Sequence, residues 1–255
     1  MQKPIKSLGQ NFLKDEIVAD NMIRSLDINQ NDVVVEIGGG LGALTQKLIN
    51  QNFFHLYVYE IDKNLIGGLR SILKNKDNVS VICESILDVD FDKLKANGKE
   101  LKIIGSIPYY ITSPIIHKLL ESKVRAERIV LLIQKEVSKK ILSRIPKANY
   151  WTHIILGYDA SLIDNVKADD FYPAPKVNSA SILLTKNKND EEILLSVGFF
   201  QWSKFLHHAF RVQRKMLNKA FSSEMLKKLK IDSNLRPQNL SRENLLSMLR
   251  FTLQK

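Results

Sequence analysis

Residues 33–45 read VVVEIGGGLGALT, and this stretch decides the fold class of the chain. Its first five residues are mostly β-branched, which is typical of a buried parallel strand. Gly38, Gly40 and Gly42 then precede residues 43–50, which we expect to form a helix. A glycine-rich turn between a strand and a helix lets a nucleotide approach the backbone closely. The stretch therefore predicts an α/β fold with a nucleotide site where its first strand ends.

Polar side chains stand at the ends of the next three predicted strands. These strands cover residues 56–61, 79–83 and 101–104. Glu60 lies 20 residues after Gly40, where a carboxylate can accept hydrogen bonds from both hydroxyls of a ribose. Glu84 and Ser106 follow the other two strands. Because the carboxyl ends of parallel strands meet in one crevice, these side chains predict a site for a cofactor that carries a nucleoside.

The glycine turn also bears on which cofactor is bound. A dehydrogenase fingerprint would have glycine at position 43, where Ala43 stands, although many such sites accept alanine. The pattern ExGxGxG, with Glu36 inside the motif, fits S-adenosylmethionine better. Glu36 could also be a buried acid that bonds local backbone amides, which is compatible with either ligand.

A second informative stretch is KIIGSIPYYIT, residues 102–112. Pro108 has no amide hydrogen and biases Ile107 away from helix, so the strand should end here. The Ser106 hydroxyl and the backbone carbonyls can accept hydrogen bonds from an amine, while Tyr109 can stack on a flat ring. An ordinary strand-to-helix turn would account for the same residues.

The order of the predicted elements divides the chain into two domains. Strands and helices alternate up to about residue 145, which indicates a doubly wound parallel sheet. Predicted strands at 152–158, 160–166 and 180–185 add a mixed end with antiparallel strands, and helices are predicted at 191–208, 212–221, 223–229 and 242–253. We therefore expect a catalytic domain over residues 1–186 and a small all-helical domain over residues 187–255.

Charge and composition limit the partners. The net charge is +11, and residues 187–255 hold 13 Lys and Arg against 6 Asp and Glu. This favours nucleic acid as a partner, with a merely solvated basic surface as the alternative. The single cysteine, Cys83, fits a reducing, cytoplasmic compartment. We expect no membrane partner, because no apolar run of about 18 residues occurs, and no metal, because the histidines lack ligand spacing.

Seven motifs spread over nearly the whole chain resemble those of one family. They are GQNFL (9–13), VEIGGGLGALT (35–45), YEID (59–62), SIPYYITSP (106–114), QKEV (134–137), FYPAPKVNSA (171–180) and AFRVQRKML (209–217). In this order they resemble the KsgA/RsmA family of ribosomal RNA adenine dimethyltransferases, whose wider family includes the Erm methyltransferases. The resemblance implies a monomer with a Rossmann-like S-adenosylmethionine methyltransferase sheet. It also implies dimethylation at N6 of two adjacent adenines near the 3′ end of small-subunit (16S) rRNA, within immature 30S subunits.

The resemblance assigns roles to individual residues. Ser106 and the Ile107 carbonyl are expected to hold the target amine, and Tyr109 and Phe171 to sandwich the flipped adenine, with Pro108 completing the catalytic set. The residues expected at the cofactor are Gln10, Asn11, Leu13, Glu36, Gly38, Gly40, Gly42, Glu60, Ile61, Glu84, Ser85 and Ser106. Those expected to contact RNA phosphates, as one helical face with i, i+4 pairs, are Arg211, Arg214, Lys215 and Lys219.

Three positions depart from the pattern of the family. Glu84 stands where Asp is usual, Gly39 stands where Pro is frequent, and Ser106 stands where Asn is usual. A serine hydroxyl can accept a hydrogen bond from the amine, but it is shorter than Asn and is also a donor. Two alternative functions therefore stay open, namely an Erm-like large-subunit rRNA methyltransferase and a weakly active or inactive ribosome-assembly factor.

Overall fold

The computed structural model describes residues 3–74, 76–94, 99–211 and 215–254. Contacts divide the chain into two compact units. The first holds Met1–Ser138 and Ala160–Lys186, and the second holds Lys139–Asp159 and Asn187–Lys255. The sequence predicts one boundary, after residue 186, whereas residues 139–159 group with the C-terminal helices.

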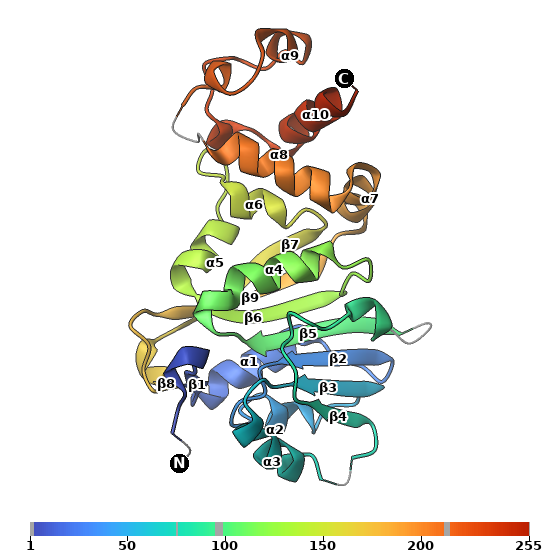
Figure 1. The fold of residues 1–255 in the computed structure, drawn as a ribbon, viewed down its shortest axis with the longest axis vertical. Coiled ribbons are helices and arrows are strands. Elements are labelled where there is room, and N and C mark those ends of the chain that lie inside the picture. Colours follow the sequence, from blue (N-terminus) through green and yellow to red (C-terminus); the bar gives the residue numbers. More distant parts are fainter. Residues whose placement is uncertain (1–2, 75, 95–98, 212–214, 255) are drawn as a thin grey trace. The chain divides into compact units, whose positions relative to one another are not determined.

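The first unit is built on a seven-stranded sheet in the order β4-β3-β2-β5-β6-β9-β7 (Figure 1). The strands are β2 (Asp32–Ile37), β3 (His55–Tyr59), β4 (Val79–Ile82), β5 (Glu100–Ser106), β6 (Arg128–Gln134), β7 (Tyr158–Val166) and β9 (Ser179–Lys186). β2 pairs in parallel with β3 and β5, and β6 pairs in parallel with β5 but antiparallel with β9. All six β2 residues are buried, as expected for a β-branched run at the centre of a parallel sheet. The predicted α/β class is confirmed.

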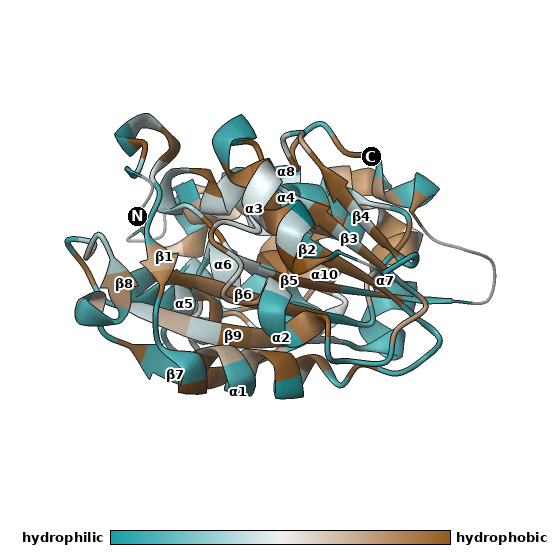
Figure 2. Ribbon diagram, turned by 90° about the horizontal axis from the view of Figure 1, so that it is seen from below, coloured by the Kyte–Doolittle hydropathy of each residue, from teal (hydrophilic) through white to brown (hydrophobic). Residues whose placement is uncertain are grey.

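Helix α1 (Glu16–Leu26) shows how the sheet is covered, since it contacts β5, β6 and β9. The Asp15 side chain caps it by accepting a hydrogen bond from the Val18 amide at 3.0 Å. Its buried residues recur at helical spacing and join the core, while Figure 2 shows the sheet strands mostly in the hydrophobic colour. The other helices of this unit are α2 (Thr45–Leu48), α3 (Lys63–Ile72), α4 (Thr112–Glu121) and α5 (Lys135–Ile141), which continues into the second unit.

A two-stranded sheet lies beside the main one. Strand β1 (Phe12–Leu13) pairs antiparallel with β8 (Phe171–Tyr172). The Lys14 amide extends this pairing by donating to the Asp170 carbonyl at 2.8 Å. The N-terminal segment is therefore fixed to the chain just before β9.

The second unit is helical. Its helices are α6 (Tyr150–Ile154), α7 (Lys188–Val197), α8 (Phe199–Arg211), α9 (Ser223–Lys228) and α10 (Arg242–Leu253). Trp202 of α8 is fully buried, and its indole Nε1 donates to the His153 carbonyl of α6 at 3.0 Å. This contact between α6 and α8 explains why residues 139–159 belong with the C-terminal helices.

Three local predictions are wrong. Residues 152–158 are predicted as a strand, but Asn149 caps helix α6 there by accepting from the Trp151 amide and donating its own amide to the Thr152 hydroxyl. The helix predicted over 191–208 is broken at Gly198, whose φ is 79°. In the described part of 212–221, residues Leu217–Lys219 form a 3-10 helix (η5).

None of the helices in the described ranges combines the length and the hydropathy that a membrane span requires.

Candidate functional site

A pocket of about 350 Å³ lies in the first unit, where β2, β3, β4 and β5 end. Nearly all the residues predicted at the cofactor and at the amine line it. They are Gln10, Asn11, Leu13, Glu36, Gly38, Gly40, Glu60, Ile61, Glu84, Ser85, Ser106, Ile107, Pro108, Tyr109 and Phe171. The structure thus brings these predicted residues to one place, as the strand-end reasoning requires.

Gly42 is the one predicted pocket residue that does not line the pocket. It has a φ of 91°, and a Cβ added to it would come within 2.4 Å of Ile72 Cδ1 in α3. Glycine is therefore required at this position for the backbone conformation and for packing against α3.

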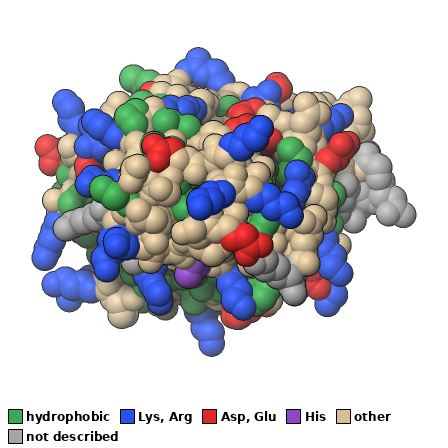
Figure 3. Space-filling model, turned by 90° about the horizontal axis from the view of Figure 1, so that it is seen from above, with side chains coloured by type: hydrophobic (Ala, Val, Ile, Leu, Met, Phe, Trp, Pro, Cys, Tyr) green, Lys and Arg blue, Asp and Glu red, His purple; other side chains and the backbone are tan. Residues whose placement is uncertain are grey.

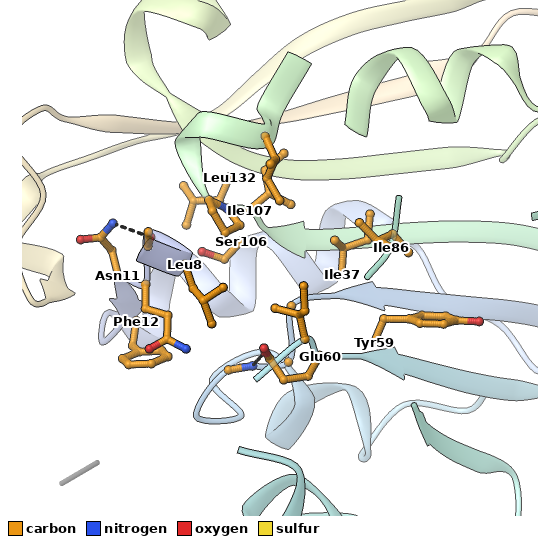
Figure 4. Close-up of a pocket in the computed structure, with 18 of the residues that line it drawn as sticks. Leu8, Asn11, Phe12, Ile37, Tyr59, Glu60, Ile86, Ser106, Ile107 and Leu132 are labelled. Carbon is orange, nitrogen blue, oxygen red and sulfur yellow. Dashed lines mark hydrogen bonds between the residues drawn. The ribbon is translucent and has the colours of Figure 1, made fainter. Parts of the chain in front are cut away.

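The glycine turn and Glu60 form one hydrogen-bonded unit. The Gly40 amide donates to Glu60 Oε2 at 2.9 Å, and the Asp62 amide donates to Oε1 at 2.8 Å. Gly38 and Gly40 have φ of 75° and 55°, which side chains rarely adopt. Figure 4 shows Glu60 at the pocket, with Ile37 and Tyr59 nearby. The carboxylate is 6% exposed and held in place by two amides, so it can accept further hydrogen bonds from a ligand without reorienting.

Glu36 lines the same pocket from the central strand and is 1% exposed. The Thr45 hydroxyl donates to its Oε2 at 2.7 Å. Burial raises the pKa of Glu36 to about 8, the Thr45 hydrogen bond opposes this rise, and the charge of Glu60 adds to it. Glu36 is therefore mostly protonated at neutral pH, so the pocket holds fewer negative charges than its residues suggest.

Ile61 and Glu84 line the pocket just after the paired strands β3 and β4. Ile61 is 52% exposed although it is apolar, and Glu84 presents an exposed carboxylate at the end of β4. The neighbouring Ser85 hydroxyl accepts from the Leu87 amide at 3.2 Å, which fixes the turn. An exposed apolar side chain beside a carboxylate suits a flat, polar-edged ring.

The loop after β5 presents two free acceptors. The Ile107 amide donates to the Leu132 carbonyl at 3.3 Å, which continues the pairing of β5 with β6. Within the described ranges, neither the Ser106 hydroxyl nor the Ile107 carbonyl has a hydrogen-bond partner. Figure 4 shows both residues at the pocket beside Leu132. Together they can receive the N–H groups of an amine.

Two aromatic residues lie at this end of the pocket in different environments. The Tyr109 hydroxyl is 2.6 Å from the Ser179 hydroxyl, and burial raises the pKa of Tyr109 while this hydrogen bond lowers it. Phe171 is only 3% exposed and belongs to the core cluster that includes Leu13 and Val18. Phe171 therefore lines the pocket as a residue packed almost entirely into the core.

The N-terminal segment forms one wall of the pocket. The Gln10 side chain accepts from the Ile5 amide and donates to Asp62 Oδ2, both at 2.7 Å. Asn11 Nδ2 donates to the Gly9 carbonyl at 3.1 Å, a bond drawn in Figure 4. The polar atoms of Gln10 thus hold the N-terminal segment against Asp62. Gln10 therefore shapes the pocket by fixing this segment through its bond to Asp62.

Sequence reasoning missed several wall residues. Phe12 and Tyr110 both line the pocket, and a Cβ on Gly9 would come within 3.0 Å of the Tyr110 ring. The second tyrosine of the Pro-Tyr-Tyr sequence and the aromatic residue inside GQNFL were the available signals.

The predicted RNA face is less regular than a single helix. Arg211 ends α8, Lys219 ends the 3-10 helix η5, and both are exposed, as is Lys215 between them. Arg214 lies outside the described residues. The predicted i, i+4 pairing is wrong for Lys215 and Lys219, because residues 215–219 do not continue α8. Figure 3 shows Lys and Arg side chains distributed over the face that carries the C-terminal helices.

The described residues contain no group of three His, Cys, Asp or Glu side chains that could hold a metal ion.

Comparison with known proteins identifies the family. A family model described as "Ribosomal RNA adenine dimethylase" matches residues 1–254. "Ribosomal RNA small subunit methyltransferase A" of Francisella tularensis subsp. tularensis (strain WY96-3418) is 34% identical over 259 residues, covering 98% of this chain and 97% of that protein.

Two solved structures share the fold. A dimethyladenosine transferase from Plasmodium falciparum aligns with a TM-score of 0.82 at 22% identity, over 95% of this chain and 98% of that chain. The 23S rRNA methyltransferase ErmE aligns with a TM-score of 0.69 at 21% identity, over 94% and 98%. The resemblance inferred from the motifs is confirmed, and this chain belongs to the ribosomal RNA adenine dimethylase family of S-adenosylmethionine-dependent methyltransferases.

Proposed function

We propose that this protein transfers methyl groups from S-adenosylmethionine to N6 of two adjacent adenines near the 3′ end of small-subunit rRNA during ribosome biogenesis. The observation that carries the proposal is a single pocket in which Glu60 stands at the end of β3, while Ser106 and Ile107, at the end of β5 on the other side of β2, present acceptors that have no hydrogen-bond partner among the described residues. The similarity to a small-subunit methyltransferase supports the choice of rRNA.

The pocket residues fit the cofactor. Gly38 lacks a Cβ on the side facing the Ser106 carbonyl, so the backbone there is open to a ligand. Glu60 would accept hydrogen bonds from the ribose hydroxyls, Ile61 would lie against the adenine, and Glu84 would accept from its amine. Glu36, being mostly neutral, adds little repulsion toward a carboxylate on the ligand. When bound, S-adenosylmethionine supplies an electrophilic methyl group on a sulfonium sulfur.

The residues of the chain act mainly by positioning the target amine. Adenine N6 is a poor nucleophile because its lone pair is delocalised into the ring. Hydrogen bonds from its two N–H groups to the Ser106 hydroxyl and the Ile107 carbonyl favour a pyramidal nitrogen whose lone pair is available. Holding that nitrogen at a fixed position accounts for most of the rate enhancement.

The adenine must leave its stack to reach this pocket, which costs a few kcal/mol. Stacking on Tyr109 offsets part of that cost, because the ring lines the pocket next to the amine acceptors. Phe171 lines the pocket from β8, and its packing among core residues keeps the ring in place.

The basic C-terminal helices supply affinity for RNA through phosphate contacts, with Arg211, Lys215 and Lys219 as described members of the set. RNA helices are recognised mostly by shape and backbone, so we expect a structured target. Binding to immature small subunits should weaken steeply between about 50 and 200 mM salt, because the logarithm of the affinity of a phosphate-binding protein falls linearly with the logarithm of the salt concentration. A monomeric state and a cytoplasmic location stay predictions.

Methyl transfer from radiolabelled S-adenosylmethionine tests the proposal. Immature small subunits lacking the two dimethyladenosines should accept up to four methyl groups each, mapped to two adjacent adenines. Ser106→Ala should reduce transfer roughly tenfold by removing one acceptor, whereas Cys83→Ser, an exposed change outside the pocket, should leave it unchanged. Label found only in large-subunit rRNA, or binding of small subunits without any transfer, would refute the proposal.

A further inference from the structure

We infer that Ser179 is a positioning residue for the methylation reaction, because its hydroxyl fixes the ring of Tyr109 on which the target adenine stacks. This inference rests on the proposed function and deepens it. Ser179 lies outside the Ser106–Tyr109 loop, being the first residue of β9, and does not itself line the pocket.

The contact is a short, partly buried hydrogen bond. The two hydroxyl oxygens are 2.6 Å apart, and Ser179 is 0% exposed. Ser179 lies opposite Gln134 in the β6–β9 ladder, so its backbone is fixed by the sheet. The Tyr109 phenol is protonated at neutral pH, because its ordinary pKa is 10 and burial raises it further. A rigid partner therefore holds the end of a ring that starts in a loop.

The loop needs such a partner. Tyr109 follows Pro108 and begins a 3-10 helix (η3, Tyr109–Ile111) that has no side-chain cap. The phenol oxygen lies on the axis of the terminal torsion of the side chain, so the bond to Ser179 fixes where the ring lies, while packing decides its rotation about that axis. The bond to Ser179 spans 70 residues of sequence and joins this loop to the first residue of β9.

The same segment supplies both aromatic contacts. Residues 171–179 begin with Phe171 and end with Ser179, so the chain that presents one ring also fixes the other. A shift of this segment would move both sides of the adenine site together. The Tyr109 hydroxyl is meanwhile occupied, which leaves the Ser106 hydroxyl and the Ile107 carbonyl to receive the amine.

A positioning role predicts a specific kinetic pattern. Affinity for the ribosomal particle comes mostly from phosphate contacts by the basic helices, so misplacing the Tyr109 ring should lower kcat and leave KM within about twofold. A loss of general stability would instead lower the unfolding temperature and the affinity for S-adenosylmethionine.

A double-mutant cycle on methyl transfer to immature small subunits tests the inference. Tyr109→Phe keeps the ring and removes its hydroxyl, and Ser179→Ala removes the partner. Each should lower kcat by about fivefold to twentyfold, and the double variant should be no worse than the poorer single variant. The affinity for S-adenosylmethionine, measured by calorimetry, should change less than twofold in all three.

The second unit offers a matched control. The Tyr150 hydroxyl lies 3.3 Å from the Ser203 hydroxyl, and neither residue lines the pocket, so Tyr150→Phe breaks another tyrosine–serine contact and should leave kcat unchanged. Wild-type kcat in Tyr109→Phe and Ser179→Ala, or losses that multiply in the double variant, would overturn the inference. Wild-type protein that transfers no methyl groups would refute the proposed function, and the inference with it.

Discussion

Replacing Glu36 with Gln tests the electrostatic description of the pocket most sharply. The carboxyl group is fully buried in the central strand, where the backbone of Thr45 bonds to it and the Thr45 hydroxyl donates to Oε2 at 2.7 Å. Gln has the same shape, and its carbonyl oxygen can accept that bond. The change therefore removes the ionisation of Glu36 while keeping its packing.

The magnitude follows from the pKa of Glu36, which burial raises from 4.5 to about 8. Each pKa unit corresponds to about 1.4 kcal/mol, so ionising this group in the folded state costs on the order of 5 kcal/mol relative to the unfolded state. The folded pKa is the higher one, so this contribution to stability is fully present below pH 4.5 and is lost as the pH rises through 8. Between pH 6 and pH 8 the loss is about 2 kcal/mol.

Urea unfolding of the cofactor-free protein at pH 6 and pH 8 provides the assay. The stability of the Gln variant relative to wild type should rise by about 2 kcal/mol on going from pH 6 to pH 8, because only wild type loses the contribution. Glu84→Gln serves as control, since that side chain is exposed to water in the folded protein. An identical difference between Glu36→Gln and wild type at both pH values would refute the reasoning.

Three further predictions concern other side chains. Lys102→Met should destabilise the protein by about 3–5 kcal/mol in chemical denaturation, because it leaves the fully buried Asp32, its partner at 2.8 Å, without a counter-charge, and the double variant with Asp32→Asn should recover most of this loss. Burial lowers the pKa of His153 to about 4, so wild type should lose stability as the pH falls from 6.5 to 4. His153→Leu should flatten this dependence in thermal scans, and it also removes two buried nitrogens that have no hydrogen-bond partner in the described part of the chain. Ser106→Asn should raise kcat for methyl transfer severalfold, because the longer acceptor reaches the amine more fully; a fall in kcat would show that the pocket is fitted to serine.

Much of the site could be predicted because its signals are local. A β-branched run identifies the central strand, and a polar residue just after a strand is carried to the sheet edge whatever the rest of the chain does. Glu60 and Ser106 were therefore placed correctly from sequence alone. Gly42 was predicted at the cofactor from its spacing in the glycine turn, but that spacing does not reveal that this glycine packs against Ile72.

Other features depend on contacts between distant residues or on competition between local signals. One example is the bond between Tyr109 and Ser179, which are 70 positions apart, and another is the bond between Gln10 and Asp62, which are 52 positions apart. A periodic pattern in the sequence cannot predict such contacts. Residues 152–158 are apolar and β-branched enough to suggest a strand. The Asn149 cap and the burial of the segment against α8 decide in favour of helix there.

The hydrogen bonds that begin at Ile5 have a thermodynamic consequence. They run through Gln10 and Asp62 to Glu60 and from there to Gly40 without interruption. A ligand that favours the present orientation of Glu60 must therefore also favour the docked arrangement of the N-terminal segment, and by reciprocity a docked segment must tighten the ligand by the same factor. Affinity for the cofactor and protection of the first dozen residues from proteases are two measurements of a single coupling free energy.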